Sequence, residues 1–289
     1  MKRIAILGCE NSHAEAFLTA IAEKTEFSDV CVVGVYSDKR EAAEKLNAKF
    51  SVPILENYTD AVGKIDGLII TARHGDNHYK YAKPYIESGI PMFIDKPITI
   101  NEDEGIEFMR ALKENNIRIS GGSSLKQDVF VRKLKEEARE EVGGKTVGGY
   151  VRAPLQSDSV YGGFYFYAQH LTEMVSEIFG RFPLSVTAKK NGGQIHVLFH
   201  YENYDCVGLF CDKNNLYYAS RMAQTSVSSY NIPATNDWFY EEFSEFYGIL
   251  SGKEQTVTYD EFIAPVFVMN AIDRSIEGGI EETVRKIQI

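Results

Sequence analysis

Short apolar runs alternate with amphipathic stretches through residues 1–122, and this alternation constrains the fold more than any other feature. The runs are rich in β-branched and apolar residues, as expected for strands that are buried on both faces of a sheet. They cover residues 4–7, 31–36, 67–71, 92–94 and 117–120, with a weaker candidate at 53–55. Strands that alternate with helices predict βαβ units, and therefore an α/β fold around a doubly wound parallel sheet of the Rossmann type.

Two of the intervening helices have readable starts. Ser12 is followed three residues later by Glu15, and Asn101 is followed in the same way by Glu104. Such pairs are typical of capped helix N-termini, so we expect helices to be capped at Ser12 and Asn101.

The pattern changes after Gly121, where a second domain is expected to begin. A helical stretch, alternating strands and two further helical stretches follow, at 126–141, at 195–200 and 207–211, and at 238–250 and 260–275. We therefore predict a Rossmann domain over 1–122 and, over 123–289, an α+β domain with a mostly antiparallel, open-faced sheet.

The formal net charge of −10 disfavours nucleic acid and anionic membranes as partners, because both are bound through an excess of Lys and Arg. We expect a small-molecule partner instead. The four cysteines show no CxxC spacing, so we predict reduced thiols and no bound metal. No apolar run approaches the ~18 residues of a membrane span, and we expect a cytoplasmic protein.

The loop after the first predicted strand, LGCENSH, is a partial match to the dinucleotide fingerprint GxGxxG. Gly8 fits the first glycine, whereas Glu10 and His13 stand at the second and third. A helix N-terminus at Asn11 and Ser12 still offers backbone N–H groups to a phosphate. The loop therefore predicts a dinucleotide site, and the alternative is an ordinary strand-to-helix turn that binds nothing.

Asp38 follows the second predicted strand. A carboxylate there can accept hydrogen bonds from an adenosine ribose and would repel a 2′-phosphate, which favours NAD over NADP. Lys39 and Arg40 leave the choice open, because they could contact a 2′-phosphate. Asp38 could equally cap the next helix while the two basic side chains are solvated.

The strand over 92–94 runs into Asp95, Lys96 and Pro97, which is the most specific chemical signal in the sequence. Pro97 disfavours helix at Lys96 and places its ammonium group at the rim of the predicted cofactor site. If burial lowers its pKa, Lys96 can give or take a proton or polarise a substrate hydroxyl. The alternative is a surface lysine that follows a strand.

His170 and Glu173 lie three residues apart on a predicted helix that follows a Gly-Gly turn. On one helical face the carboxylate can orient the imidazole, which could then shuttle a proton. The pair could also be structural, or could supply two metal ligands, although no third ligand is signalled by the spacing. For His74 and His78, four residues apart, we expect solvated or capping roles.

Together, the first strand with its turn, the DKP motif, the Gly-Gly-to-histidine helix and the segment that begins FSEFYGIL resemble the Gfo/Idh/MocA dehydrogenases in order and spacing. The match of DKP to the family's EKP motif implies that Lys96 is the catalytic lysine. His170 keeps the histidine of the family's DxGxH pattern, with Phe166 in place of its aspartate. Tyr165 or Tyr167 could supply a replacement hydroxyl, so Tyr167 joins Lys96 and His170 as a candidate catalytic residue.

The resemblance also implies which residues contact each ligand. The cofactor would contact Gly8, Glu10, Asn11, Ser12, His13, Asp38, Thr71, His78, Asp95 and Lys96, and the substrate would contact Lys96, Lys126, Tyr165 and His170. The implied reaction is hydride transfer between NAD or NADP and a sugar, cyclitol or related hydroxyl compound, in a homo-oligomer. Two alternatives stay open: a catalytically degenerate relative that senses a ligand or dinucleotide, and a non-redox enzyme with tightly bound NAD.

Overall fold

The computed structural model describes residues 1–289 and divides into two compact units. The first unit contains Met1–Gly122, Asn236–Tyr259 and Ile289, and the second contains Ser123–Thr235 and Asp260–Gln288. The chain leaves the first unit after Gly122, where the sequence analysis placed its boundary. The predicted domain assignment needs one correction, because Asn236–Tyr259 was assigned to the second domain and folds as part of the first unit.

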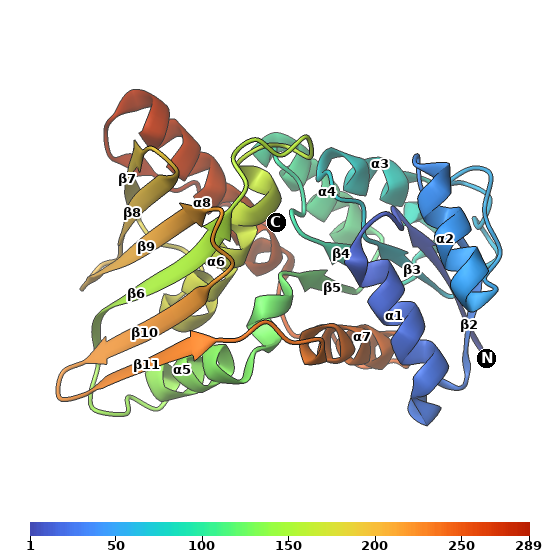
Figure 1. Cartoon of the computed structure of the whole chain (residues 1–289), viewed down its shortest axis with the longest axis horizontal. Coiled ribbons are helices and arrows are strands. Elements are labelled where there is room, and N and C mark those ends of the chain that lie inside the picture. The colour runs from blue at the N-terminus through green and yellow to red at the C-terminus, as the bar shows by residue number, and fades with distance from the viewer. The chain divides into compact units, whose positions relative to one another are not determined.

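The first unit is built on five parallel strands in the order β2-β1-β3-β4-β5 (Figure 1). The strands are β1 (Lys2–Leu7), β2 (Val30–Tyr36), β3 (Gly67–Ile70), β4 (Met92–Asp95) and β5 (Ile119–Gly122). Every residue of β3, β4 and β5 is buried, which confirms the predicted parallel sheet covered on both faces. Residues 53–55 form only an isolated parallel bridge beside β2, since Pro53 has no N–H with which to extend a ladder.

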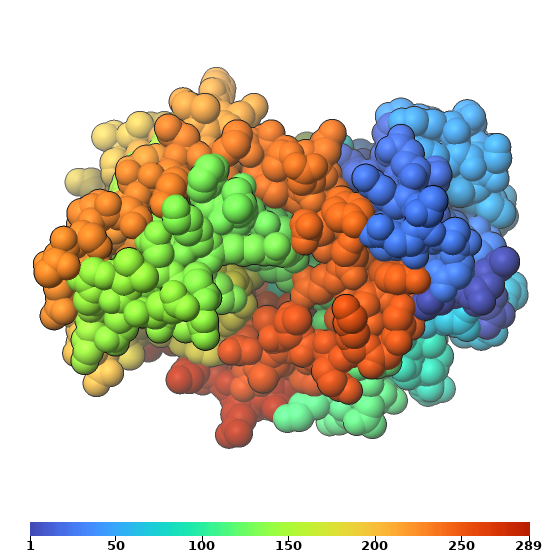
Figure 2. Space-filling model, turned by 90° about the horizontal axis from the view of Figure 1, so that it is seen from below, coloured from blue at the N-terminus to red at the C-terminus, as the bar shows by residue number.

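Helices cover both faces of this sheet (Figure 1). The helices α1 (Ser12–Glu23) and α7 (Asp237–Leu250) lie on one face, and α3 (Asp76–Ala82) and α4 (Glu102–Glu114) lie on the other. The unit is completed by α2 (Arg40–Phe50) and the 3-10 helices η1 (Thr25–Phe27) and η2 (Lys83–Ser88). Figure 2 shows α7 packed directly against α1.

An aromatic cluster joins α7 to the rest of the first unit. Phe17 of α1 lies 5.0 Å from Phe93 of β4 and 5.5 Å from Phe243 of α7, measured between ring centroids. Phe246, three residues further along α7, also packs on Phe93. All four side chains are fully buried, and burial of one such ring stabilises a fold by roughly 1.5–3 kcal/mol. The spacing of these phenylalanines on one helical face explains why this late segment returns to the first unit.

The helix caps agree with the sequence at one of the two predicted positions. Asn101 caps α4, because its Oδ1 accepts a hydrogen bond of 3.0 Å from the Glu104 N–H. At α1 the cap is Asn11, whose Oδ1 accepts from the Ser12 N–H at 2.8 Å. Ser12 is therefore the first helical residue, and the prediction that it caps α1 was wrong by one position.

The second unit is a seven-stranded sheet with helices on one face (Figure 1). Its order is β11-β10-β6-β9-β8-β7-β12, and the pairings are antiparallel apart from β6 with β9. The strands are β6 (Thr146–Leu155), β7 (Ser185–Asn191), β8 (Gln194–His200), β9 (Asp205–Asp212), β10 (Tyr217–Ala223), β11 (Val227–Ile232) and β12 (Glu282–Thr283), and the helices are α5 (Val129–Arg139), α6 (Tyr165–Phe179) and α8 (Tyr259–Gly278). This confirms the predicted, mostly antiparallel α+β architecture.

One predicted helix of the second unit is divided in two. The stretch 126–141 contains the end of η3 (Ser124–Gln127) and then α5, because Asp128 between them caps α5 by accepting from the Phe130 N–H at 2.8 Å. Across the whole structure, no helix is both long enough and apolar enough to span a membrane.

Candidate functional site

The loops that follow the parallel strands of the first unit meet at the carboxyl edge of the sheet, where open α/β sheets bind ligands. Gly8 begins the first of these loops with a φ of +79°, and a Cβ there would lie 2.3 Å from the Ala72 backbone nitrogen. The buried Thr71 hydroxyl donates to the Gly8 carbonyl at 3.1 Å. The loop after β1 therefore lies directly against the loop after β3, and position 8 requires glycine. The predicted ligand residue Thr71 holds this contact.

The Asn11 side chain joins the N-terminus of α1 to the end of β4. Its Oδ1 accepts from the Ser12 N–H, and its Nδ2 donates to Asp95 Oδ2 at 2.7 Å. The first N–H groups of a helix have no partner within the helix and carry the positive end of its dipole. This end of α1 therefore has the anion-binding character that the sequence predicted.

The Glu10 carboxylate crosses from the first loop to the ends of β2 and β3. Its Oε2 accepts from the Ser37 hydroxyl at 2.7 Å, and its Oε1 accepts from the Arg73 N–H at 3.1 Å. Asp38, which the sequence marked as the ribose ligand, instead accepts from the Tyr36 hydroxyl at 2.6 Å and lies 3.8 Å from Lys80 Nζ. Of these two carboxylates, that of Glu10 is therefore the one bonded to residues at the ends of both β2 and β3.

Lys96 is buried at the end of β4, with 4% of the residue exposed. Its backbone N–H donates to Asp95 Oδ1 at 2.6 Å. Burial lowers the pKa of Lys96, opposed by the charges of Asp95 and Glu242 and reinforced by that of Arg73. The alternative of an exposed surface lysine was therefore wrong, and burial favours the neutral amine of Lys96.

His13 lies in a different place from the one its sequence position suggested. It is buried on α1, with its ring nitrogens 3.2 Å from Asp95 Oδ2 and 3.2 Å from Glu242 Oε2. Sequence reasoning did not find Glu242, which lies on α7. One signal was available: Glu242 stands four residues from both Trp238 and Phe246, on the buried stripe of an otherwise apolar helix face.

The His78 side chain contacts the backbone of two of the loops and is not exposed to solvent. Its Nε2 lies 2.7 Å from the Ala72 carbonyl and its Nδ1 lies 3.2 Å from the Ile98 carbonyl, and the side chain is fully buried. Burial lowers the pKa of His78 to about 4, although both carbonyls oppose the change. His78 therefore links the loop after β3 to the segment that follows Lys96. The expectation of a solvated or capping role was therefore wrong for His78. His74 Nδ1 accepts from the Asp76 N–H at 3.3 Å at the start of α3, whose N-cap is Gly75.

In the second unit, His170 is buried on α6 and is oriented by a serine. The Ser123 hydroxyl lies 2.7 Å from His170 Nδ1, and the rings of Tyr167 and Tyr217 lie 5.2 and 6.1 Å away between centroids. Glu173, which was predicted to orient the imidazole, accepts from Gln169 at 3.2 Å and pairs with Arg181 at 3.5 Å. Gln169 and Arg181 thus hold the Glu173 carboxylate while Ser123 contacts the imidazole, and neither Ser123 nor Tyr217 carried a sequence signal.

The two remaining predicted substrate residues also lie in the second unit. The Tyr165 hydroxyl donates to Asp273 Oδ2 of α8 at 3.0 Å, which fixes its ring at the start of α6. Lys126 lies in η3, where its charge acts on Glu173: burial raises the pKa of Glu173, and Arg181 and Lys126 oppose that rise.

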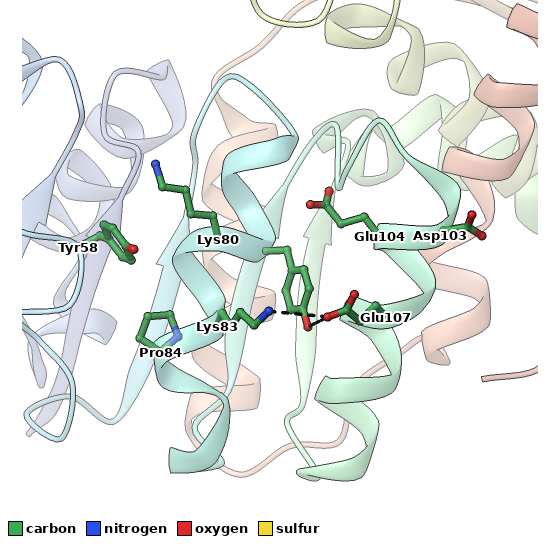
Figure 3. Close-up of a pocket in the computed structure, with 8 residues that line it drawn as sticks. Tyr58, Lys80, Lys83, Pro84, Asp103, Glu104 and Glu107 are labelled. Atoms are coloured by element: carbon green, nitrogen blue, oxygen red, sulfur yellow. Dashed lines mark hydrogen bonds and ion pairs between the residues drawn. The ribbon is translucent and has the colours of Figure 1, made fainter.

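The first unit has two surface cavities, of which the second reaches Ser12 at the start of α1. One of about 700 Å³ lies between the helices α3 and α4, and Figure 3 shows lysines on one side and carboxylates on the other. Its charged groups are partly engaged, since Glu107 accepts from the Tyr79 hydroxyl at 2.8 Å and pairs with Lys83 at 3.8 Å. The second, of about 860 Å³, lies between α1 and α7. Neither contains Lys96.

Comparison with known proteins identifies the first unit and the fold of the whole chain. Residues 2–123 match the Gfo/Idh/MocA family model, described as an oxidoreductase family with an NAD-binding Rossmann fold. No curated protein sequence matches significantly.

Several solved structures share the fold over their full length. A myo-inositol 2-dehydrogenase from Lactobacillus plantarum has a TM-score of 0.84 at 15% identity, covering 98% of this chain and 99% of the other. A scyllo-inositol dehydrogenase from Lactobacillus casei, solved with NAD(H) and scyllo-inositol, has a TM-score of 0.85 at 14% identity, covering 98% and 99%. A myo-inositol dehydrogenase from Corynebacterium glutamicum has a TM-score of 0.84 at 14% identity, covering 99% and 100%.

The residues at the carboxyl edge fit the nicotinamide dinucleotide that this Rossmann fold binds. Gly8 provides the close turn, and the N-terminus of α1 provides N–H groups for a pyrophosphate. The bonds from Ser37 and Arg73 direct the Glu10 carboxylate toward the ends of β2 and β3. Its negative charge is thereby held on the side where an adenosine ribose binds in such folds, not over the helix N-terminus.

Proposed function

Residues 2–123 of the chain match the Gfo/Idh/MocA oxidoreductase family, and we propose that the whole chain is an NAD-dependent dehydrogenase of a cyclitol or related polyol. The observation that carries the proposal is Lys96, a buried lysine with a lowered pKa at the carboxyl edge of an NAD-binding sheet. When bound, NAD accepts a hydride from the carbon that bears the reacting hydroxyl.

Side chains of this protein accept the proton that the reaction releases. As the hydroxyl carbon loses its hydride, the hydroxyl proton passes to a base and a carbonyl forms. We assign this role to Lys96, because burial lowers its pKa and thereby favours the unprotonated amine that can accept a proton. In the second unit, His170 is the proton-handling candidate, and its Ser123 contact fixes the ring for that purpose.

We assign the choice between NAD and NADP to Glu10. A carboxylate on the ribose side accepts hydrogen bonds from free ribose hydroxyls and repels a 2′-phosphate. Asp38 is less suited to this role, because Tyr36 and Lys80 hold its side chain. NAD is therefore the proposed cofactor.

The cyclitol class is supported by the inositol dehydrogenases that share the fold, and by the chemistry around His170. There a buried imidazole lies beside the rings of Tyr167 and Tyr217. Aromatic faces pack on the C–H faces of cyclic polyols, while polar groups at their edges select hydroxyl positions.

The proposal is tested by assaying the purified protein with NAD and a panel of inositols, hexoses and linear polyols, following NADH formation. We expect oxidation of at least one cyclitol, and a loss of at least about 100-fold in kcat for Lys96→Met, within the range for removal of an acid–base group. The matched control is Lys83→Met, an exposed lysine of η2. Equal activity in the Lys96 variant and the control would contradict the proposed role.

A ligand-sensing protein without turnover is the second candidate. The observation that favours it is Phe166, which replaces the family's aspartate with a side chain that cannot carry a proton. This candidate requires that NAD and a polyol bind while no substrate in the panel yields NADH.

A further inference from the structure

We propose that His13 and Glu242 are positioning residues that act on Lys96 through Asp95. This role rests on the proposed dehydrogenase function, in which Lys96 is the base. Neither residue belongs to the DKP motif: His13 is the second residue of α1, and Glu242 lies on α7, late in the chain.

The geometry is a buried imidazole between two buried carboxylates. Nδ1 of His13 lies 3.2 Å from Asp95 Oδ2, and Nε2 lies 3.2 Å from Glu242 Oε2. The angles of these contacts fall outside hydrogen-bond geometry, and burial lowers the pKa of His13, so they are close polar contacts. Both carboxylate side chains are fully buried, and the imidazole is nearly so. Water therefore screens these charges little, and each acts strongly on its neighbours.

Aromatic rings fix the imidazole in this position. The Phe239 ring of α7 lies 4.7 Å from the His13 ring and the Phe17 ring of α1 lies 5.9 Å away, both in edge-to-face arrangement. The imidazole thus has aromatic rings around it and a carboxylate at each ring nitrogen. Rotation of the imidazole ring would break its contacts with both carboxylates.

The Asp95 carboxylate connects His13 to the backbone of Lys96. Its Oδ2, which contacts His13, also accepts from Asn11 Nδ2 at 2.7 Å, while its Oδ1 accepts from the Lys96 N–H at 2.6 Å. A change at His13 therefore alters the orientation of the carboxylate that holds the Lys96 backbone.

Five titratable or charged groups act on Lys96 from the elements around it. Asp95 of β4 and Glu242 of α7 favour its charged form, and Arg73, after β3, opposes it. Burial lowers the pKa of His13 and of His78, and the charge of Lys96 adds to both reductions. Loss of the Glu242 charge should therefore favour the neutral amine of Lys96. Loss of the imidazole should do the same through Asp95, because His13 favours the Asp95 carboxylate and that carboxylate favours the ammonium ion.

The test measures the Lys96 pKa directly in the cofactor-free, full-length protein labelled with ¹³C-lysine, with the signal assigned by Lys96→Arg. We expect Glu242→Gln to lower the Lys96 pKa by about one unit, a tenfold change in the protonation equilibrium. We expect His13→Gln to lower it as well, by about half a unit, because Asp95 loses a contact that favours its carboxylate. Glu242→Asp, which keeps the charge, should stay closer to the native value than Glu242→Gln does.

The matched control is Glu241→Gln, which removes a carboxylate one residue away on α7. An unchanged Lys96 pKa in folded Glu242→Gln, or the same shift in Glu241→Gln, would overturn the proposal. If Glu242→Gln does not fold, His13→Gln alone tests the proposal: a lower Lys96 pKa supports it, and no change or a higher pKa overturns it.

A kinetic measurement separates this proposal from the proposed function. In Glu242→Gln the pH profile of kcat for polyol oxidation should move to lower pH by the same shift as the Lys96 pKa, while the Kd for NAD changes less than twofold. A profile that stays at the native pH overturns the positioning role. If no polyol is oxidised, the proposed function fails, and the Lys96 pKa still tests the linkage.

Discussion

Glu10 is the residue at which this chain departs most from a glycine-rich dinucleotide loop. Its carboxylate is held by the Ser37 hydroxyl and the Arg73 N–H, at the ends of β2 and β3. A carboxylate in the place of the second glycine therefore need not prevent pyrophosphate binding, because its bonds turn the charge toward the ribose side.

A charge substitution at Glu10 tests this assignment. Glu10→Gln removes the repulsion of a 2′-phosphate, so we expect the preference for NAD over NADP, as a ratio of Kd values, to fall about tenfold, or about 1.4 kcal/mol. Asp38→Asn is the control and should leave the ratio within about twofold, because Tyr36 and Lys80 hold that side chain. Calorimetric titration gives both ratios. The reverse pattern would return the role to Asp38.

Single residues were predictable from the sequence where the signal is local. Gly8 and Lys96 could be identified because a turn glycine and a lysine before proline are recognised from the few residues around them. The His13 contact was not predictable, because its partner Glu242 comes from α7. The Ser123 contact with His170 was missed for the same reason, since no spacing relates two residues so far apart in the chain.

At the scale of elements, the short helix α3 connects two loops of the site through His78. Its ring nitrogens contact the carbonyls of Ala72 and Ile98, and burial lowers its pKa from an ordinary value of 6.5 to about 4. The folded protein therefore keeps His78 neutral over a pH range in which the unfolded chain protonates it.

This difference predicts a pH-dependent stability. The contribution of His78 is fully present above its ordinary pKa and is lost as the pH falls from 6.5 toward about 4. The free energy of unfolding, taken as native minus His78→Gln, should therefore fall by about 3 kcal/mol between pH 7 and pH 4. Urea unfolding across this range gives the value, with the exposed His196→Gln as control. A difference independent of pH would contradict the buried neutral state.

Elements were predicted well where burial is uniform and less well at their ends. The strands β3 and β4 were found because they are apolar apart from Asp95, as expected for strands covered on both faces, whereas the run predicted at 117–120 begins two residues before β5. Residues 53–55 have the right composition, but Pro53 limits them to a single bridge. Asp128 could not be identified as a cap from periodicity alone, and it divides what reads as one helix.

At the scale of the whole molecule, the order of elements along the chain predicted both architectures but not the path of the chain between them. Alternating strands and helices gave the parallel sheet of the first unit, and alternating polarity gave the antiparallel sheet of the second. The return of α7 to the first unit depends on the packing of Phe243 and Phe246 against β4 and α1. An amphipathic pattern identifies a helix face without naming the surface that it covers.

The central claim is that this chain binds and uses NAD through the loops of its first unit. The most direct test is calorimetric titration of the purified, cofactor-stripped protein with NAD, NADH, NADP and NADPH. We predict binding of NAD and NADH with a clear preference over the phosphorylated pair. Absence of binding to all four would contradict the claim, and preferential binding of NADP and NADPH would contradict the role assigned to Glu10.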